Sequence, residues 1–290
     1  MEQEVVTVGL DLAKTVFQVH AIAADGAVLI RRKLRRTEVI RFFAKLSPCL
    51  VGMEACASAH HWARELIAIG HEVRLMPPAY VKPYVKRGKT DAADAEAICE
   101  AVTRPTMRFV AVKSVEQQAV LMLHKSRDLM VRQRTMLINA LRGHLAEYGI
   151  VTGLGAGGVT ASLGALQEEQ DRLPVHARSA LQGIAAQLRA LGSEIDRLEA
   201  RILAWHRNDE TSRRLATIPA IGPITASTIA AAVPDASLFR SGRQFTTWLG
   251  LTPRANSSGG KERLGGITKQ GDGDLRRLLR RPHREQLVEV

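Results

Sequence analysis

The sequence predicts an α/β domain at the amino-terminal end, then a long helical region, then a mostly helical carboxy-terminal domain. Two observations on periodicity predict this order. Short apolar or alternating runs, typical of strands, all lie before residue 77. Over residues 114–148 and 181–205, apolar side chains recur every three or four positions, which is typical of helices. The predicted domains are therefore residues 1–112, 113–210 and 211–290.

Composition narrows the function classes. The chain has 290 residues, a net charge of +12 and an isoelectric point near 10.2. Such an excess of cations favours a polyanionic partner, because each neutralised phosphate releases counterions. The sequence has neither a long apolar run nor a signal peptide, so we expect no membrane association. Three cysteines without paired spacing indicate a reducing compartment, the cytoplasm.

Three strands are predicted first, at residues 5–10, 15–23 and 27–34. The first is a short apolar run that is followed at once by Asp11. The second and third are joined by Asp25-Gly26, which is typical of a two-residue hairpin turn. We therefore expect three consecutive antiparallel strands, with a carboxylate at the end of the first.

Helices and strands are then expected to alternate. The predicted elements are a helix capped by Thr37 and ending near 46, a strand at 50–53 followed by Glu54, a helix capped by Ser58 and ending at 69, a strand at 71–76 stopped by Pro77-Pro78, and a helix that begins at Thr90. This is the element order of the ribonuclease-H-like fold. Strands one and four are neighbours in such a sheet, so Asp11 and Glu54 are expected to meet.

Two further carboxylates start the last of these helices. Asp91 and Asp94 stand three residues apart, so they share one helix face, and Thr90 is a good N-cap. Beside Asp11 and Glu54 they would complete a site for two magnesium ions, which in phosphoryl transfer hold the attacking and leaving oxygens. The stretch just before them is basic and includes Lys86, Arg87 and Lys89. The alternative is an acidic helix start balanced by nearby cations.

The second helical stretch carries a regular apolar seam, formed by Leu181, Ile184, Leu188, Leu191, Ile195, Leu198, Ile202 and Trp205. Spacings of three and four alternate along it, which predicts a coiled coil. Its partner is either the helix predicted at 114–148, whose own stripe runs from Val120 to Tyr148, or another chain. The glycine-rich residues 149–158 between the two helices read as a flexible break.

The carboxy-terminal region contains two motifs. Residues 215–233 resemble a helix-hairpin-helix, although Ala220 stands where that motif usually has its first glycine. Farther on, Ser257 and Ser258 precede Gly259-Gly260 in a strongly basic segment that includes Arg254, Lys261 and Lys269. A serine in such a loop is either an ordinary turn residue or a nucleophile among phosphate-binding cations.

Taken together, these motifs resemble the DEDD transposases of insertion sequences, which have a RuvC-like amino-terminal domain. The similarity rests on residues 9–14 (GLDLAK), 51–55 (VGMEA), 89–95 (KTDAADA), 250–253 (GLTP), 258–261 (SGGK) and 266–271 (GITKQG). All of them occur in the order and rough spacing of that family. The match runs over nearly the whole chain.

The resemblance implies specific roles. The four acidic residues of the family fall on Asp11, Glu54, Asp91 and Asp94, as ligands of Mg²⁺. Its serine nucleophile falls on Ser258, with Ser257 as the second choice. Because they lie near these residues in the sequence, Lys86, Arg87, Lys89, Arg254, Lys261 and Lys269 are candidates for binding nucleic acid. The resemblance also implies a recombinase that acts on element ends and target DNA with a structured guide RNA, as a homodimer or homotetramer.

Two other functions fit parts of the sequence. A metal-dependent nuclease, such as a junction resolvase, needs only the amino-terminal carboxylates, with water as nucleophile. The second possible function is that of a non-catalytic remnant that only binds nucleic acid. It is suggested by the end of the chain, because the apolar helical pattern stops at Leu279 and Pro282 would break a continuing helix. On this reading the chain is truncated relative to the family. We expect the apolar face of the helix around residues 275–279 to be left without cover.

Overall fold

The computed structural model describes residues 4–86, 90–261 and 263–280. It divides into two compact units, Met1–Val115 and Glu116–Val290. Among the helices in the described part of the chain, none is long and apolar enough to cross a membrane.

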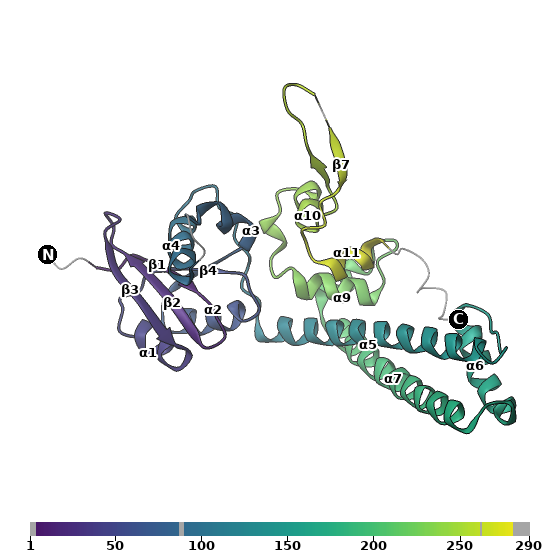
Figure 1. Cartoon of the computed structure of the whole chain (residues 1–290). Coiled ribbons are helices and arrows are strands. Elements are labelled where there is room, and N and C mark those ends of the chain that lie inside the picture. Colours follow the sequence, from purple (N-terminus) through teal and green to yellow (C-terminus); the bar gives the residue numbers. More distant parts are fainter. Residues whose placement is uncertain (1–3, 87–89, 262, 281–290) are drawn as a thin grey trace. The chain divides into compact units, whose positions relative to one another are not determined.

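The first unit is built on a five-stranded mixed sheet (Figure 1). Its strands are β1 (Thr7–Asp11), β2 (Val16–Ile22), β3 (Val28–Arg35), β4 (Leu50–Glu54) and β5 (Glu72–Met76). They lie in the order β3-β2-β1-β4-β5. The pairs β1–β2 and β2–β3 are antiparallel, whereas β1–β4 and β4–β5 are parallel. All five predicted strands are confirmed, and so is the expected contact between the first and the fourth.

Alternation along the strands divides the core into two layers. Val8 and Leu10 of β1 are fully buried in the cluster that includes α1 (Val39–Phe43) and α2 (Ala59–Ala68). On the opposite face lies α4 (Asp91–Val102), whose apolar side chains form a second cluster with Leu50. The sheet is therefore covered on both faces, and α4 covers β1, β2 and β4.

One local prediction is wrong. Thr37 is not an N-cap, because it lies within the 3₁₀ helix η1 (Arg36–Glu38), where Glu38 Oε2 instead accepts from the Arg35 N–H at 2.7 Å. The predicted stop at Pro77-Pro78 is confirmed, since β5 ends at Met76, and α3 (Pro78–Val81) and η2 (Lys82–Tyr84) follow directly. Proline is well suited to the first helical position, since its missing N–H has no partner there in any helix.

The second unit begins with three helices. They are α5 (Val115–Ala146), α6 (Gly155–Glu168) and α7 (Val175–Asn208), with η3 (Gln170–Arg172) between the last two. The predicted break at 149–158 is therefore partly wrong, since α6 already starts at Gly155. Gly158 explains the tight path, because a Cβ there would stand 1.9 Å from the carbonyl oxygen of Gly153.

The apolar seam of α7 is covered within one chain. Leu181 and Leu188 pack in one cluster with Leu141 and Leu145 of α5 and Leu166 of α6. Farther along the helix, Ile195, Leu198 and Ile202 are also buried. The expected stripe on α5 is correct at Val120 and Leu141 but wrong at Tyr148, which is exposed beyond the end of the helix.

The rest of the second unit is a small helical cluster with a β-hairpin. Its elements are α8 (Glu210–Leu215), α9 (Pro223–Ala232), η4 (Ala236–Leu238), α10 (Gly242–Trp248), β6 (Pro253–Ala255), β7 (Leu264–Ile267) and α11 (Gly273–Arg280). The expectation that the apolar face of α11 lacks cover is wrong. Leu275 is fully buried, and Leu279 packs on the same cluster with Ile229 and Leu249, because α9 and the end of α10 cover this face.

Candidate active site

The first group of candidate residues lies at the carboxyl ends of two neighbouring parallel strands. β1 ends at Asp11 and β4 ends at Glu54, one position beyond the register pair Leu10–Met53. Both carboxylates are half-buried. The alternation of side chains puts them on the face of the sheet that α4 covers. The structure thus brings these two predicted residues to one edge of the sheet.

A pair of glycines lets α4 approach that face. Gly9 in β1 and Gly52 in β4 are register partners. A Cβ at Gly9 would stand 2.1 Å from the carbonyl oxygen of Ala95, and one at Gly52 would stand 2.7 Å from Val102 Cβ. The backbone of α4 therefore lies directly on β1, which no larger residue at position 9 would permit. No local pattern in the sequence predicts this role for either glycine.

The first turn of α4 supplies the other two predicted carboxylates. Thr90 caps the helix, since its Oγ1 accepts from the Ala93 N–H at 3.2 Å, and Asp91 and Asp94 follow in the first turn. Burial, which is the largest cause, and the nearby charges of Asp94 and then Asp91 together raise the pKa of Asp11 to about 6. The negative charges of Asp11, Asp94 and Asp91 therefore lie close together, as they do where several carboxylates share one site.

The fit of this cluster to a metal ion is incomplete in the structure. The donor type is right, because hard divalent cations prefer carboxylate oxygens, and a cation would relieve the repulsion felt by Asp11. However, within the described ranges no three acidic, histidine or cysteine side chains stand close enough to hold an ion. Asp11 lies near Asp94 and Asp91, but these carboxylates do not form a closed coordination shell.

The basic stretch before α4 is only partly described. Arg87 and Lys89 lie outside the described residues. Lys86 is exposed and donates to Glu96 Oε1 at 2.7 Å, a bond that raises the pKa of Lys86. Arg31 of β3 also lies 3.7 Å from Glu96. A phosphate at Lys86 would therefore compete with a carboxylate already in place.

The predicted serine loop is the tip of the β6–β7 hairpin, an element that the sequence analysis did not predict. Gly259 and Gly260 both have positive φ, 58° and 76°, and the Lys261 N–H donates to the Ser258 carbonyl at 3.2 Å. Two consecutive positive φ values are typical of the tight turns that suit β-hairpins. The adjacent glycines were therefore a usable signal for this hairpin.

The two serines differ in their surroundings. Ser257 Oγ accepts from the Arg263 N–H at 3.1 Å, so this hydroxyl ties the two sides of the hairpin together. Ser258 is the first residue of the turn and is exposed. Arg254 lies on β6, Lys261 in the tip and Lys269 beyond β7, and all three side chains are exposed. The hairpin therefore presents a hydroxyl and cations together.

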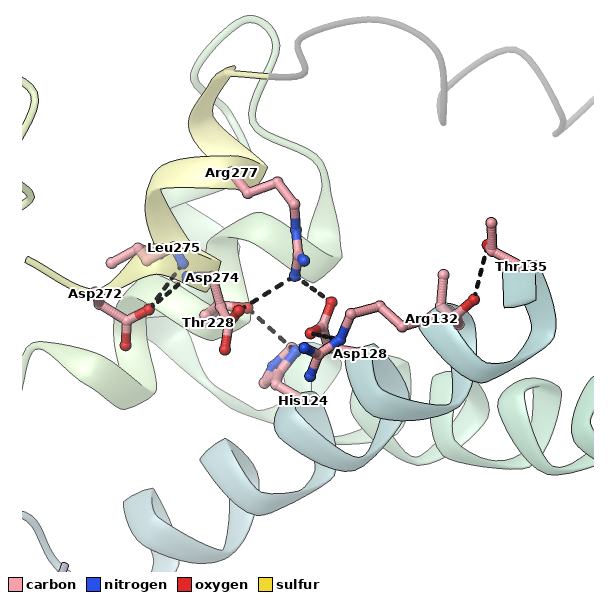
Figure 2. Close-up of polar contacts among 10 residues, drawn as sticks. His124, Asp128, Arg132, Thr135, Thr228, Asp272, Asp274, Leu275 and Arg277 are labelled. Atoms are coloured by element: carbon pink, nitrogen blue, oxygen red, sulfur yellow. Dashed lines mark hydrogen bonds and ion pairs between the residues drawn. The ribbon is translucent and has the colours of Figure 1, made fainter. Parts of the chain in front are cut away.

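A polar network between α5, α9 and α11 was missed by sequence reasoning (Figure 2). His124 of α5 is buried, and its ring nitrogens lie 3.1 Å from the hydroxyls of Ser227 and Thr228. Burial, which is the larger cause, and the charge of Arg127 together lower the pKa of His124 to about 4. The ring is therefore neutral at pH 7. The only local signal was the four-residue spacing of His124 and Asp128 on one helix face.

Asp128 and Arg277 make the second part of this network. They form a short ion pair between α5 and α11, as Figure 2 shows. Each also has an opposite charge on its own helix: Arg132 Nε lies 3.1 Å from Asp128 Oδ2, and Asp274 Oδ1 lies 3.4 Å from Arg277 Nη2. This network seats the helix that follows the serine hairpin.

Two family models of known proteins match the chain, one in its amino-terminal part and one in its carboxy-terminal part. Residues 8–150 match a family model of a DEDD transposase of the IS110 type, and residues 212–286 match the model described as the transposase IS116/IS110/IS902 family. A probable family 20 transposase of Pseudomonas aeruginosa is 51% identical over 274 residues, which cover 94% of this chain and 81% of that protein. The chain belongs to this transposase family.

Two other transposases are similar over the same extent. The transposase for insertion sequence element IS1328 of Yersinia enterocolitica is 41% identical over 95% of this chain and 82% of its own length. The one for IS1111A of Coxiella burnetii is 39% identical over 96% and 76%. In the transposase described here, the first matched region contains all four predicted carboxylates and the second contains Ser258. Membership of the family makes DNA its substrate.

Proposed function

We propose that this transposase cuts and rejoins DNA with two separate sets of side chains, the carboxylates Asp11, Glu54, Asp91 and Asp94 and the nucleophile Ser258. The observation that carries the proposal is the position of Asp11, whose pKa is raised first by burial and then by the charges of Asp94 and Asp91 in the first turn of α4. A cluster of like charges at strand ends costs stability, so a function at this point accounts for it better than folding does.

The amino-terminal unit is, on this proposal, a ribonuclease-H-like domain of the RuvC type. The strand order β3-β2-β1-β4-β5, with one antiparallel and one parallel half, supports this assignment. Mg²⁺ bound by the carboxylates would stabilise the charge that develops on the scissile phosphate. Asp11 and Glu54 would hold it from the sheet, and Asp91 and Asp94 from α4.

Ser258 is the proposed nucleophile because its position suits attack. Its Oγ forms a bond to phosphorus while the bond from phosphorus to the 3′-oxygen breaks. The hydroxyl proton leaves to solvent, and the departing 3′-oxygen takes up a proton. A 3′-hydroxyl of another strand then attacks the phosphoserine, which frees Ser258 and joins the strands. Ser257 is the weaker candidate, because its hydroxyl already accepts a hairpin hydrogen bond.

Partners of the transposase form a further part of the proposal. Its net charge of +12 supports contact with DNA and with a structured guide RNA. Assembly into homodimers or homotetramers is supported by four exposed apolar side chains of α5 at intervals of seven residues, Val115, Met122, Leu129 and Met136. Residues 113–210 would then act both as connector and as assembly region. The three unpaired cysteines of the chain suit the reducing cytoplasm.

Trapping of a covalent protein–DNA adduct tests the proposal. We expect the wild-type chain to form an adduct with element-end DNA only when Mg²⁺ is present. Ser258→Ala should abolish the adduct and leave DNA binding intact, since it removes one oxygen and no charge, whereas Ser257→Ala should keep it. DNA cleavage without any adduct would instead indicate a nuclease in which water attacks. If the Asp11→Asn and Ser258→Ala variants both still cleaved DNA, both assignments would be refuted.

A further inference from the structure

A cavity of about 570 Å³ lies between the base of the serine hairpin and α11. Its lining residues are Leu251, Arg254, Gly266, Ile267, Lys269 and Arg280. Three of them are cations with exposed side chains, and none of the lining residues in the described part of the chain is acidic. Leu251 and Ile267 are half-buried and give the cavity an apolar part. Its volume is in the range of about 300–1,000 Å³ that is usual for small-ligand sites.

The backbone around the cavity is held in place by close contacts. Gly250 has φ 72°, and a Cβ there would stand 2.6 Å from the Gln270 nitrogen; a Cβ at Gly271 would stand 2.1 Å from the carbonyl oxygen of Trp248. The two chain segments that enter and leave the hairpin therefore touch through their backbones. Arg276 fastens the same point, since its Nη1 donates to the Leu249 carbonyl at 2.8 Å and to the Gly271 carbonyl at 3.2 Å.

The cations are positioned by this framework. Lys269 has φ 58°, a left-handed conformation that is unfavourable for a residue with a side chain, and its N–H donates to the Gly250 carbonyl at 3.0 Å. Arg254 Nη2 donates to the Thr268 carbonyl at 3.3 Å. A strained lysine and an arginine held on a carbonyl thus face one cavity. Such strain is more often retained at a binding site than elsewhere.

We propose that this cavity binds one unpaired nucleotide of the DNA strand that Ser258 attacks, with its base on Leu251 and Ile267 and its phosphates on Arg254, Lys269 and Arg280. The inference rests on the proposed role of Ser258. A base inside a duplex is stacked and cannot enter a concave site, so the ligand is a single-stranded segment. Arg254 precedes Ser258 by four residues, or about 13 Å of extended strand. The bound nucleotide thus lies within about four nucleotides of the attacked phosphate, at 3.4 Å per stacked nucleotide.

Equilibrium binding in the Ser258→Ala background tests this inference without any chemistry. The ligands are a short single-stranded DNA, the same sequence as a duplex and the same sequence as RNA, in buffer without Mg²⁺. The cavity variant is Arg254→Gln/Lys269→Gln/Arg280→Gln. The matched control is Arg189→Gln/Arg201→Gln/Arg207→Gln on the exposed face of α7, which removes the same charge. Because neither Ser258 nor a metal takes part, failure of the proposed reaction does not affect the result.

We expect the cavity variant to bind single-stranded DNA at least about tenfold more weakly, with a salt-dependence slope reduced by about 2, as loss of three phosphate contacts predicts. The control should change affinity by less than about threefold, since surface charge acts there only at long range. Equal losses in both variants, or equal losses for duplex and single strand, would overturn the cavity site. Preferential loss of RNA binding would overturn DNA as its occupant.

A second ligand tests whether a base enters the cavity. An abasic strand of equal length keeps the sugar–phosphate chain but lacks every base. We expect the Ser258→Ala chain to bind it more weakly than the normal strand, while the cavity variant binds the two strands alike. If the Ser258→Ala chain binds both strands equally, the cavity holds only phosphates and the nucleotide site is refuted. Circular dichroism confirms that the compared variants are folded.

Discussion

Gly9 of β1 and Gly52 of β4 lie side by side in the parallel register, and together they form the surface on which α4 rests. A Cβ at Gly9 would collide with the backbone of α4, which cannot move away as a flexible side chain can. Gly9→Ala should therefore lower the free energy of unfolding by about 3 kcal/mol, the upper end for overpacking. It should also move Asp91 and Asp94 away from Asp11.

The matched control is Gly183→Ala in α7, where an added Cβ meets nothing within 4 Å and the backbone is helical. There alanine should stabilise by about 0.5–1 kcal/mol, because glycine is the poorer helix former. Urea denaturation measures both changes. A Gly9→Ala protein as stable as the wild type would show that α4 does not press on β1 as described.

Asp94→Asn should lower the pKa of Asp11 from about 6. Burial of Asp11 is the largest cause of the raised pKa and remains in the variant, but the like charge of Asp94 is removed. The pKa should therefore settle between 6 and the ordinary 3.8. Carboxyl-carbon NMR titration without metal measures it. Asp171→Asn, on an exposed residue of the other unit, should leave it unchanged; an unaltered pKa in Asp94→Asn would mean that the two carboxylates are not neighbours.

Stability should fall at mildly acid pH because of His124. Its pKa is about 4 in the folded protein against 6.5 for an ordinary histidine, so the unfolded chain binds the proton first. The contribution of neutral His124 is complete above pH 6.5 and is lost as the pH falls toward 4, by about 3 kcal/mol. Denaturation at several pH values should give a shallower profile for His124→Gln. The similarly shifted His60 is the internal reference, since it is unchanged in both proteins.

Ala220→Gly should stabilise the second unit. Ala220 has φ 68° in the turn between α8 and α9, a conformation in which a Cβ is unfavourable. Glycine removes that strain but adds freedom to the unfolded chain, so we expect a net gain of about 0.5–1 kcal/mol. Thermal denaturation should therefore show a higher Tm. A lower Tm would indicate that the Ala220 methyl group makes contacts that outweigh the strain.

Much of the first unit could be predicted from sequence because its signals are local. The signals are the apolar runs, the Asp25-Gly26 turn and the Thr90 cap, and each acts within a few residues. The predicted strands and the predicted start of α4 are therefore confirmed. The seating of α4 could not be predicted in this way. It depends on Gly9 and Gly52, which are distant in sequence and become partners only in the folded sheet.

The second unit was harder to predict for the same reason. The contacts of His124 with Ser227 and Thr228 join residues more than a hundred positions apart, and no periodicity marks them. The cover of α11 was misjudged because it comes from α9, earlier in the chain, and not from a following helix. The β6–β7 hairpin did have a local signal in Gly259-Gly260. Its basic composition led to the prediction of a phosphate-binding loop, and the two strands were not predicted.

The ion pair between Asp128 and Arg277 has a consequence for how firmly α11 is attached. Separating a partly buried pair usually leaves two lone charges, which costs about 3–5 kcal/mol. Here each charge has a second partner on its own helix. Arg132 Nε lies 3.1 Å from Asp128 Oδ2 on α5, and Asp274 Oδ1 lies 3.4 Å from Arg277 Nη2 on α11. If α11 separated from α5, each charge would keep the opposite charge on its own helix, and neither would be left alone. The ion pair therefore adds less to the attachment of α11 than a pair without such neighbours would, beside the packing of Leu275 and Leu279.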